Sequence, residues 1–221
     1  MPKYIVANWK QNKNLKEISD WLEVYKNQDF VLSSDINVIV CPSFPYLNFL
    51  KENSDAELLS IATQDVSEYS VGSHTGNVGA EQVKDFCTYS IIGHSERKED
   101  RTLVNKKRDL CLENSITPII CFVSLTDAIN SAVPGVILAM EDPTNISKNG
   151  VYNVQNPTAI EESLNEVKSK LSIEVPLLYG GSVNKDNVTS LSAIDTLNGI
   201  LVGHASLDAL HFIKLVQAFN N

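Results

Sequence analysis

The sequence predicts an α/β protein built as a single (β/α)8 barrel over residues 1–221, and three observations lead to that prediction. Short apolar runs alternate with amphipathic segments along the chain, which is the β-then-α pattern of parallel sheets. Eight such runs occur, the number that closes a barrel. No Pro-, Gly- or Ser-rich linker and no shift in composition divides the chain, whose length suits a one-domain α/β barrel.

The apolar runs and the amphipathic segments give the expected elements in order. The predicted strands are residues 4–8, 36–41, 58–63, 89–93, 118–122, 135–141, 175–180 and 199–203. Helices are expected at residues 15–25, 80–86, 101–113, 158–171 and 206–219. Little chain separates Glu96 from Glu141, so we expect shortened helices between strands four and six, above all near residues 125–131. A thin outer layer there would expose apolar surface that another subunit could cover, as in a tetramer.

The composition indicates a globular chain. It contains 43% hydrophobic and 20% charged residues, and no window approaches the roughly 18 uninterrupted apolar residues of a membrane span, so we expect no membrane as partner. The first six residues enter an apolar run directly, without the basic region and cleavage site of a signal peptide. We therefore expect a cytoplasmic protein.

The charge and the cysteines exclude further classes. A formal net charge of -9 with no basic run argues against nucleic acid as a partner. An anionic ligand would have to be attracted by local devices such as backbone N–H groups and one or two lysines. The four cysteines are too widely spaced for a C-x-x-C redox or zinc pattern. We expect neither disulfides nor a metal, and the sequence indicates no cofactor.

Polar residues directly after the predicted strands have priority, because barrel enzymes place their chemistry at the C-terminal ends of the strands. Strand one is followed by Asn8 and Lys10, strand four by His94 and strand six by Glu141. Alone, a His or Glu at a strand end is more often a hydrogen-bonded structural residue. Their joint placement on three strand ends favours an active site.

Two further strand ends indicate a phosphate site. The segments 178–182 (LYGGS) and 200–206 (ILVGHAS) end strands seven and eight, where barrels commonly bind phosphate through backbone N–H groups. Taken singly, these glycines fit equally well with tight βα turns. Together they favour a phosphate cradle.

In order and spacing these motifs resemble the triosephosphate isomerase family over nearly the whole chain. The matching segments are Asn8-x-Lys10, 91–97 (IIGHSER), 179–182 (YGGS) and 201–203 (LVG). The resemblance implies a TIM barrel that interconverts dihydroxyacetone phosphate and D-glyceraldehyde 3-phosphate, in glycolysis and gluconeogenesis. The enzyme class would be an intramolecular oxidoreductase, an aldose–ketose isomerase.

The resemblance also assigns the catalytic roles. Glu141 would be the base that moves a proton between neighbouring carbons, with His94 polarising the carbonyl and Lys10 holding the negative charge of the enediolate. The family is the standard illustration of a histidine kept neutral by a helix N-terminus, and residues 95–97 look like such a helix start. Asn8 would donate to the substrate, and Glu96 would orient the other groups.

Phosphate binding and oligomerisation are implied in the same way. The phosphate would meet the backbone N–H groups of Ser147, Ser182, Gly203 and His204, under a lid that follows Glu141 and suppresses elimination of phosphate. The segment 65–79 is similar to the family's long loop after strand three. The resemblance implies that its Thr75 reaches Asn8 and Glu96 of a partner subunit in a homodimer.

The chain departs from the family pattern at two places around these groups. The usual Gly-Thr-Gly of the lid tip is replaced by Ser147-Lys148-Asn149, and Asp142 stands where a proline usually follows the base. We expect altered lid closure with phosphate binding retained, because glycines with a wide φ range are lost. His204 replaces a glycine, and because His is enriched at positive φ, we expect it to tolerate that conformation. One hypothesis puts its imidazole beside the phosphate; the alternative is an outward-pointing surface side chain.

Two other functions stay open from the sequence. The departures fit a catalytically impaired barrel that acts as a phosphate-ligand binder or structural oligomer, although the retained Lys10, His94 and Glu141 argue against it. Another phosphate-handling barrel, such as an aldolase or a synthase, would usually need an inward Schiff-base lysine or a larger pocket. Neither feature is evident in the sequence.

Overall fold

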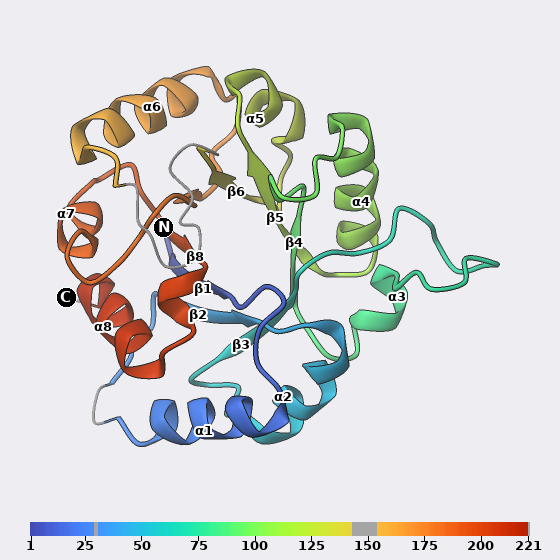
Figure 1. Ribbon diagram of the computed structural model, residues 1–221. Helices are drawn as coiled ribbons and strands as arrows, with labels where there is room; N and C mark the ends of the chain where they lie inside the picture. The colour runs from blue at the N-terminus through green and yellow to red at the C-terminus, as the bar shows by residue number, and fades with distance from the viewer. Residues whose placement is uncertain (29–30, 143–153, 221) are drawn as a thin grey trace.

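The computed structural model describes residues 1–28, 31–142 and 154–220, and in these ranges the eight predicted strands close into one parallel barrel (Figure 1). Each strand pairs with its neighbours in sequence order, and β8 pairs back onto β1 through Tyr4 and Gly199. The strands are β1 (Lys3–Asn8), β2 (Ile36–Cys41), β3 (Ser60–Thr63), β4 (Tyr89–Ile92), β5 (Thr117–Phe122), β6 (Ile137–Met140), β7 (Leu177–Tyr179) and β8 (Gly199–Val202). The predicted fold class is confirmed.

Helices surround the barrel (Figure 1). They are α1 (Leu15–Lys26), α2 (Leu47–Asn53), α3 (Ala80–Val83), α4 (Arg101–Glu113), α5 (Leu125–Ser131), α6 (Pro157–Lys170), α7 (Val188–Ser192) and α8 (Ala209–Phe219), with 3-10 turns η1 (Phe44–Tyr46) and η2 (His204–Ser206). Side-chain caps begin several of them. The Asn14 side chain accepts from Glu17 N at α1, and Asp100 accepts from Leu103 N at α4.

The helices differ from the prediction in number and length. Helices α2 and α7, with 7 and 5 residues, had no predicted bounds, because their short segments show no clear 3.6-residue apolar period. The short helix expected at residues 125–131 is α5, with 7 residues, whereas α4 has its full 13. The shortening between β4 and β6 therefore falls on α5, where Val123 and Ile129 are exposed.

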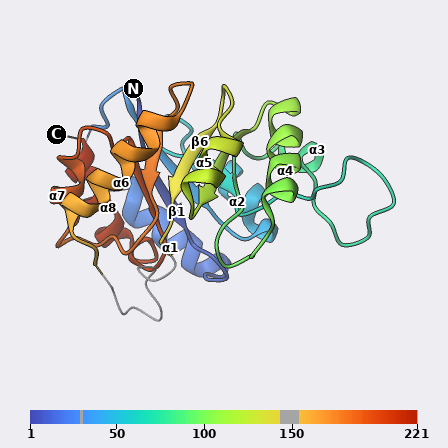
Figure 2. The same cartoon turned by 90° about the horizontal axis from the view of Figure 1, so that it is seen from above.

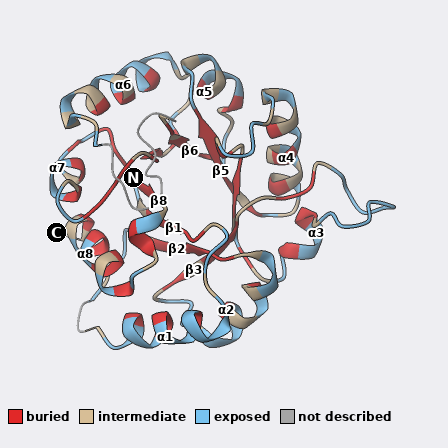
Figure 3. Ribbon diagram, viewed as in Figure 1, coloured by how far each residue is buried: buried red, intermediate tan, exposed pale blue. Residues whose placement is uncertain are grey.

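The alternation of side chains along each strand divides the core into two layers. One set fills the barrel interior and includes Val6, Ile39, Ile91 and Leu201. The intervening residues, such as Ile5 on β1, pack outward against the helices in a larger cluster. Figure 3 shows this arrangement as buried strands inside helices whose outer faces are exposed.

The barrel gathers the C-terminal ends of its strands on one face, where the loops after β1, β4, β6, β7 and β8 meet. The loop between β3 and α3 is different, because it projects away from the barrel in both views (Figures 1 and 2). The predicted lid, with its tip at Ser147-Lys148-Asn149, lies outside the described residues.

Candidate active site

The strand ends bring Asn8, Lys10, His94 and Glu96 to one cavity of about 370 Å³, which Gln64 and Asp65 also line. Glu141 lies directly beside it, in contact with His94. The sequence had grouped these residues only by their position after a strand. The barrel therefore brings together every described residue predicted to take part in proton transfer.

Lys10 stands at the end of β1 in a left-handed backbone conformation, with φ +52°. The side-chain oxygen of Asn8 accepts from the Lys10 N–H at 3.0 Å, which fixes the turn. The Lys10 ammonium lies 2.7 Å from Oε1 of Glu96. The cation is thereby aimed across the cavity from β1 toward the end of β4.

His94 is 7% exposed and is bonded through both ring nitrogens. Its Nδ1 accepts from the backbone N–H of Glu96 at 3.2 Å, so Nδ1 carries no proton. Its Nε2 lies 3.0 Å from Oε1 of Glu141 and donates to it. Burial lowers the pKa of His94; the carboxylates of Glu141 and Glu96 oppose this shift and Lys10 reinforces it. The ring is a neutral hydrogen-bond donor.

The neutrality of His94 has a different origin from the one expected. Residues 95–97 form a turn closed by Arg97 N donating to His94 O at 2.8 Å, and no helix begins there. Lys98 has φ +54°, which interrupts any helix, and α4 begins at Arg101 after its cap. The helix start predicted at residues 95–97 is wrong. Burial and the backbone N–H that Glu96 donates to Nδ1 keep the imidazole neutral instead.

Glu141 follows β6 directly, and its backbone N–H donates to Phe122 O at 2.8 Å, which continues the sheet. Its side chain is buried, and the carboxylate accepts from Ser95 N at 2.8 Å through Oε2 as well as from His94 through Oε1. Both oxygens are therefore held by donors from the loop after β4.

The turns after β7 and β8 lie next to these groups. Ser182 is buried, Gly203 is partly buried and His204 is exposed. A Cβ added to Gly203 would lie 3.4 Å from Cε of Lys10, so the Lys10 side chain passes over this glycine. The second predicted phosphate turn and Lys10 are thus in contact.

His204 does not adopt the positive φ expected from its replacement of a glycine. The described non-glycine residues with positive φ are Lys10, Lys13, Lys98 and Ser115. His204 instead begins the 3-10 turn η2, whose N-cap is Gly203. A tolerance of positive φ is not needed at position 204, because the turn uses right-handed backbone there, which any L-residue can adopt.

The contacts predicted for Ser147 and Thr75 are not tested by the described part of this chain. Ser147 lies outside the described residues. Thr75 is exposed in the projecting loop between β3 and α3. Its predicted contacts with Asn8 and Glu96 were assigned to a partner subunit.

Several residues that support Lys10 were missed by the sequence reasoning. Gln64 donates through Nε2 to Lys10 O and to Cys41 O, both at 2.8 Å, and Ser43 donates to Lys10 O at 3.2 Å. These residues follow β3 and β2 directly. The strand-end rule that selected His94 would have found them had it been applied to every strand.

A buried charge network beside the cavity was also missed. Lys107 on α4 is 2% exposed and binds both oxygens of Asp65, at 2.7 and 2.9 Å, and Glu99 at 2.7 Å. Burial raises the pKa of Asp65 against the opposing effect of Lys107. A lysine in the middle of an amphipathic helix gives no sequence signal of burial.

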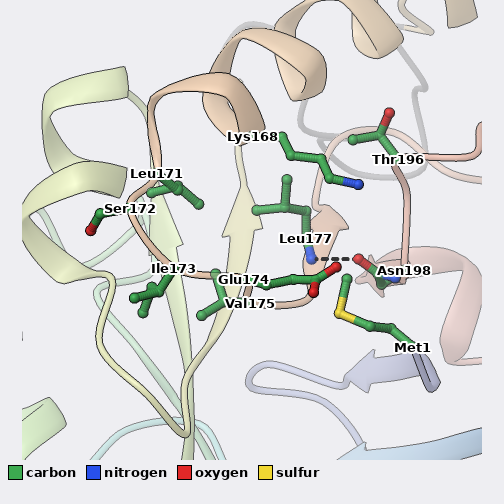
Figure 4. A pocket seen from close by; sticks show the side chains of 10 residues that line it. All are labelled: Met1, Lys168, Leu171, Ser172, Ile173, Glu174, Val175, Leu177, Thr196 and Asn198. Carbon is green, nitrogen blue, oxygen red and sulfur yellow. Dashed lines mark hydrogen bonds between the residues drawn. The ribbon is translucent and has the colours of Figure 1, made fainter.

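A second cavity, of about 230 Å³, lies at the opposite end of the barrel, where β7 and β8 begin (Figure 4). Leu177 N donates there to Asn198 Oδ1 at 3.0 Å. Lys168 and Glu174 extend into the same region from the end of α6 and the loop before β7. This cavity contains none of the strand C-terminal groups, so the catalytic candidate remains the first cavity.

Residues 1–28, 31–142 and 154–220 contain no group of three His, Cys, Asp or Glu side chains placed to hold a metal ion. The helices described in the same ranges are all too short or too polar to cross a bilayer. All four cysteines are buried free thiols.

Comparison with known proteins identifies what this architecture is similar to. The model of the family described as triosephosphate isomerase matches residues 3–219. A triosephosphate isomerase of Polynucleobacter asymbioticus is 33% identical over 252 aligned positions, which cover 98% of this chain and 99% of that protein. Proteins of the same name from Mycoplasmoides gallisepticum and Lawsonia intracellularis are 33% and 30% identical, with at least 97% of each chain covered.

Proposed function

The chain belongs to the triosephosphate isomerase family, and on this premise we propose that Glu141, His94 and Lys10 carry out its reaction. The reaction is the interconversion of dihydroxyacetone phosphate and D-glyceraldehyde 3-phosphate, an aldose–ketose isomerisation of the triose phosphates of glycolysis. The family match over nearly the whole chain does not favour a catalytically impaired barrel. It also disfavours an aldolase or synthase.

Proton transfer is assigned to Glu141. The carboxylate removes a proton from the carbon next to the substrate carbonyl; the C–H electron pair forms a C=C bond, and the carbonyl electrons move to oxygen. The same carboxylate then returns the proton to the neighbouring carbon. Support comes from its burial and from the hydrogen bonds of Ser95 and His94, which hold both oxygens at the edge of the cavity.

Stabilisation of the negative charge on the enediolate oxygens is assigned to His94, Lys10 and Asn8. A neutral imidazole with its proton on Nε2 donates to a developing oxyanion without transferring a whole proton, which suits an intermediate that must be reprotonated on carbon. Lys10 supplies the formal positive charge. Its pairing with Glu96 at 2.7 Å keeps the ammonium aimed at the cavity before substrate arrives.

Phosphate binding is assigned to the backbone N–H groups of Ser147, Ser182, Gly203 and His204. The position of Gly203 under the Lys10 side chain supports this, since a phosphate there would lie within reach of the same cation. Backbone donors suit a chain with a net charge of -9, because they attract an anion without a basic surface patch.

A homodimer through residues 65–79 is proposed, with Thr75 reaching Asn8 and Glu96 of the second copy. The projecting loop and the open cavity beside Asp65 and Glu96 support this arrangement (Figure 2). A tetramer would use the exposed Val123 and Ile129 at α5. Sedimentation of the wild type and of a variant with residues 70–77 replaced by a short glycine turn tests the dimer. We expect the variant to be monomeric and at least tenfold less active. A variant that remained dimeric would remove the assignment.

The cytoplasm is the proposed location. The four buried cysteines are free thiols, as expected in a reducing compartment. Activity measured in soluble and membrane fractions of the source cell tests this.

The single observation that supports the function best is the distance of 3.0 Å between Nε2 of His94 and Oε1 of Glu141. It places the group proposed to polarise the carbonyl next to the group proposed to remove the proton. A coupled assay with glyceraldehyde 3-phosphate tests it. Turnover that disappears in Glu141→Gln supports the assignment, and wild-type turnover no faster than a protein-free control would refute it.

A further inference from the structure

The loop between β1 and α1 carries a second lysine, Lys13, in a conformation that lysine rarely adopts. Its φ is +70°, in the left-handed region where a residue with a Cβ is strained relative to glycine. Strain of this kind persists where the surroundings hold a residue in place, and it is frequent beside binding sites. The contacts of the Lys13 side chain show what holds it.

The Lys13 ammonium joins two segments that are far apart in the sequence. It donates to Leu207 O at 2.7 Å and lies 5.3 Å from the centroid of the Trp9 ring. Burial lowers the pKa of Lys13, and the carboxylates of Glu17 and Asp208 oppose that shift. The Lys13 ammonium is therefore bound to the segment that follows β8.

Leu207 closes the turn η2, which follows the proposed phosphate-binding glycine. Leu207 N donates to His204 O at 3.1 Å, and Ser206 donates through N and Oγ to Gly203 O. Trp21 Nε1 donates to Ser206 O at 3.1 Å. The side chains of Lys13 and Trp21 thus bind the carbonyls of Leu207 and Ser206. They hold the end of η2 that lies away from its N-cap.

The opposite end of the same turn faces the catalytic lysine. A Cβ added to Gly203 would approach Cε of Lys10 to 3.4 Å. Lys10 and Lys13 stand three residues apart on one loop, both with positive φ. The loop therefore contacts the turn η2 at both ends, through Lys10 at Gly203 and through Lys13 at Leu207.

We propose that Lys13 is a positioning residue for the substrate phosphate: by holding the Leu207 carbonyl, its ammonium keeps the N–H groups of Gly203 and His204 at a fixed distance from Lys10. The inference rests on the proposed function in that Gly203 and His204 bind the phosphate. Lys13 acts through η2 and does not touch the reacting carbons. Its loss weakens phosphate binding and spares the chemical step.

The experiment compares Lys13→Met and Lys13→Gly with Lys16→Met as the matched control. Lys16 is an exposed lysine on α1 whose ammonium pairs with Asp20 only on the surface. The measurements are kcat, KM for glyceraldehyde 3-phosphate, competitive inhibition by inorganic phosphate, and Tm. Lys13→Gly separates the two contributions, because glycine accepts φ +70° without strain while lacking the ammonium.

We expect both Lys13 variants to raise KM and the inhibition constant of phosphate about tenfold, the size expected for loss of one charge-assisted hydrogen bond, with kcat within twofold. Lys16→Met leaves all values unchanged. Lys13→Gly melts at or above the temperature of Lys13→Met, yet binds phosphate equally poorly. A merely structural lysine would lower Tm and leave KM unchanged.

The proposal is overturned if KM and phosphate inhibition stay within twofold of wild type in both variants, or if kcat falls while KM does not rise. Failure of the isomerase assignment is distinguishable, since it shows as absent turnover in the wild type. Calorimetric binding of inorganic phosphate to wild type and to Lys13→Gly then still reports on Lys13.

Discussion

Nε2 of His94 lies 3.0 Å from Oε1 of Glu141, while Nδ1 of the same ring accepts the Glu96 N–H. The imidazole is therefore fixed in one tautomer, with its only proton directed toward the proposed base. In this arrangement Glu141 must release His94 and Ser95 before it reaches a substrate carbon. The same hydrogen bonds fix the proton of His94 on Nε2, where it can donate to another acceptor once Glu141 has moved away.

Replacing the base separates its chemical role from its structural one. We expect Glu141→Gln to lower kcat by about 10³-fold, because an amide cannot accept the carbon-bound proton. The amide oxygen still accepts from Ser95 N, so Tm stays within a few degrees. Glu141→Asp keeps the charge on a shorter side chain and loses less activity. Steady-state kinetics and thermal melting check both variants, and Gln activity within a few-fold of wild type would contradict the role.

The pH dependence of stability follows from the lowered pKa of His94. In the unfolded chain His94 takes up a proton near its ordinary value of 6.5, whereas the folded ring resists protonation. The unfolded state then binds more protons, so stability falls as the pH drops below about 6.5, by at most about 1.4 kcal/mol per pH unit for one group.

Urea unfolding at pH 7.5 and 5.5 measures this effect in the wild type and in His94→Gln. We expect the variant to lose less stability on acidification, because the group that must charge is gone. His204→Gln serves as control, since this histidine is exposed. A His94 ring that titrates above pH 6.5 by NMR would show that burial does not control its protonation.

Removing Lys107 tests the buried charge network. Lys107→Met removes the buried cation of Asp65 and Glu99 and leaves both carboxylates with Arg97, whose side chain is partly exposed. We expect the free energy of unfolding to fall by about 2–3 kcal/mol, whereas solvent screening makes the exposed pair broken in Lys16→Met contribute little. Urea titration measures both, and equal losses would place Lys107 among ordinary surface ion pairs.

The turn after β7 is sensitive to a single methyl group. A Cβ at Gly181 would lie 2.1 Å from Oη of Tyr179, a ring with no exposed surface. We expect Gly181→Ala to cost about 1–3 kcal/mol of stability, since the buried ring must move. Gly72→Ala, where the nearest atom is 3.4 Å away, is the matched control. Thermal melts that show no difference between the two would contradict the prediction.

The sequence predicted the barrel because its signal is repeated eight times, so an error in one element does not change the topology. The bounds of the short helices α2 and α7 were not predicted, because five to seven residues do not establish a helical period. The equally short α5 was located from the small number of residues between its neighbouring strands. Residues 95–97 resemble a helix start in the sequence, but the structure has a turn there. Nothing local in that motif indicates that Lys98 takes a positive φ and delays α4 to Arg101.

The candidate site, like the fold, could be predicted from the sequence only in part. Asn8, Lys10, His94 and Glu141 could be selected because each follows a strand. Their partners could not: the bond from Glu96 N to His94 Nδ1 and the passage of Lys10 over Gly203 depend on loop conformations set by long-range contacts. The link from Lys13 to Leu207 joins the two ends of the chain, and no sequence pattern specifies such a pair.

The strand order also has a consequence for synthesis on the ribosome. Of the eight strand pairings in the described barrel, seven join strands that are consecutive along the chain, and one, β1 with β8, joins its two ends. A nascent chain can form the seven local pairings progressively, but the ring cannot close until β8 has emerged. Until then β1 and β7 present open edges that attract other strands. The segment that begins with β8 at Gly199 therefore decides whether the sheet stays soluble, and slow translation there prolongs the period of greatest aggregation risk.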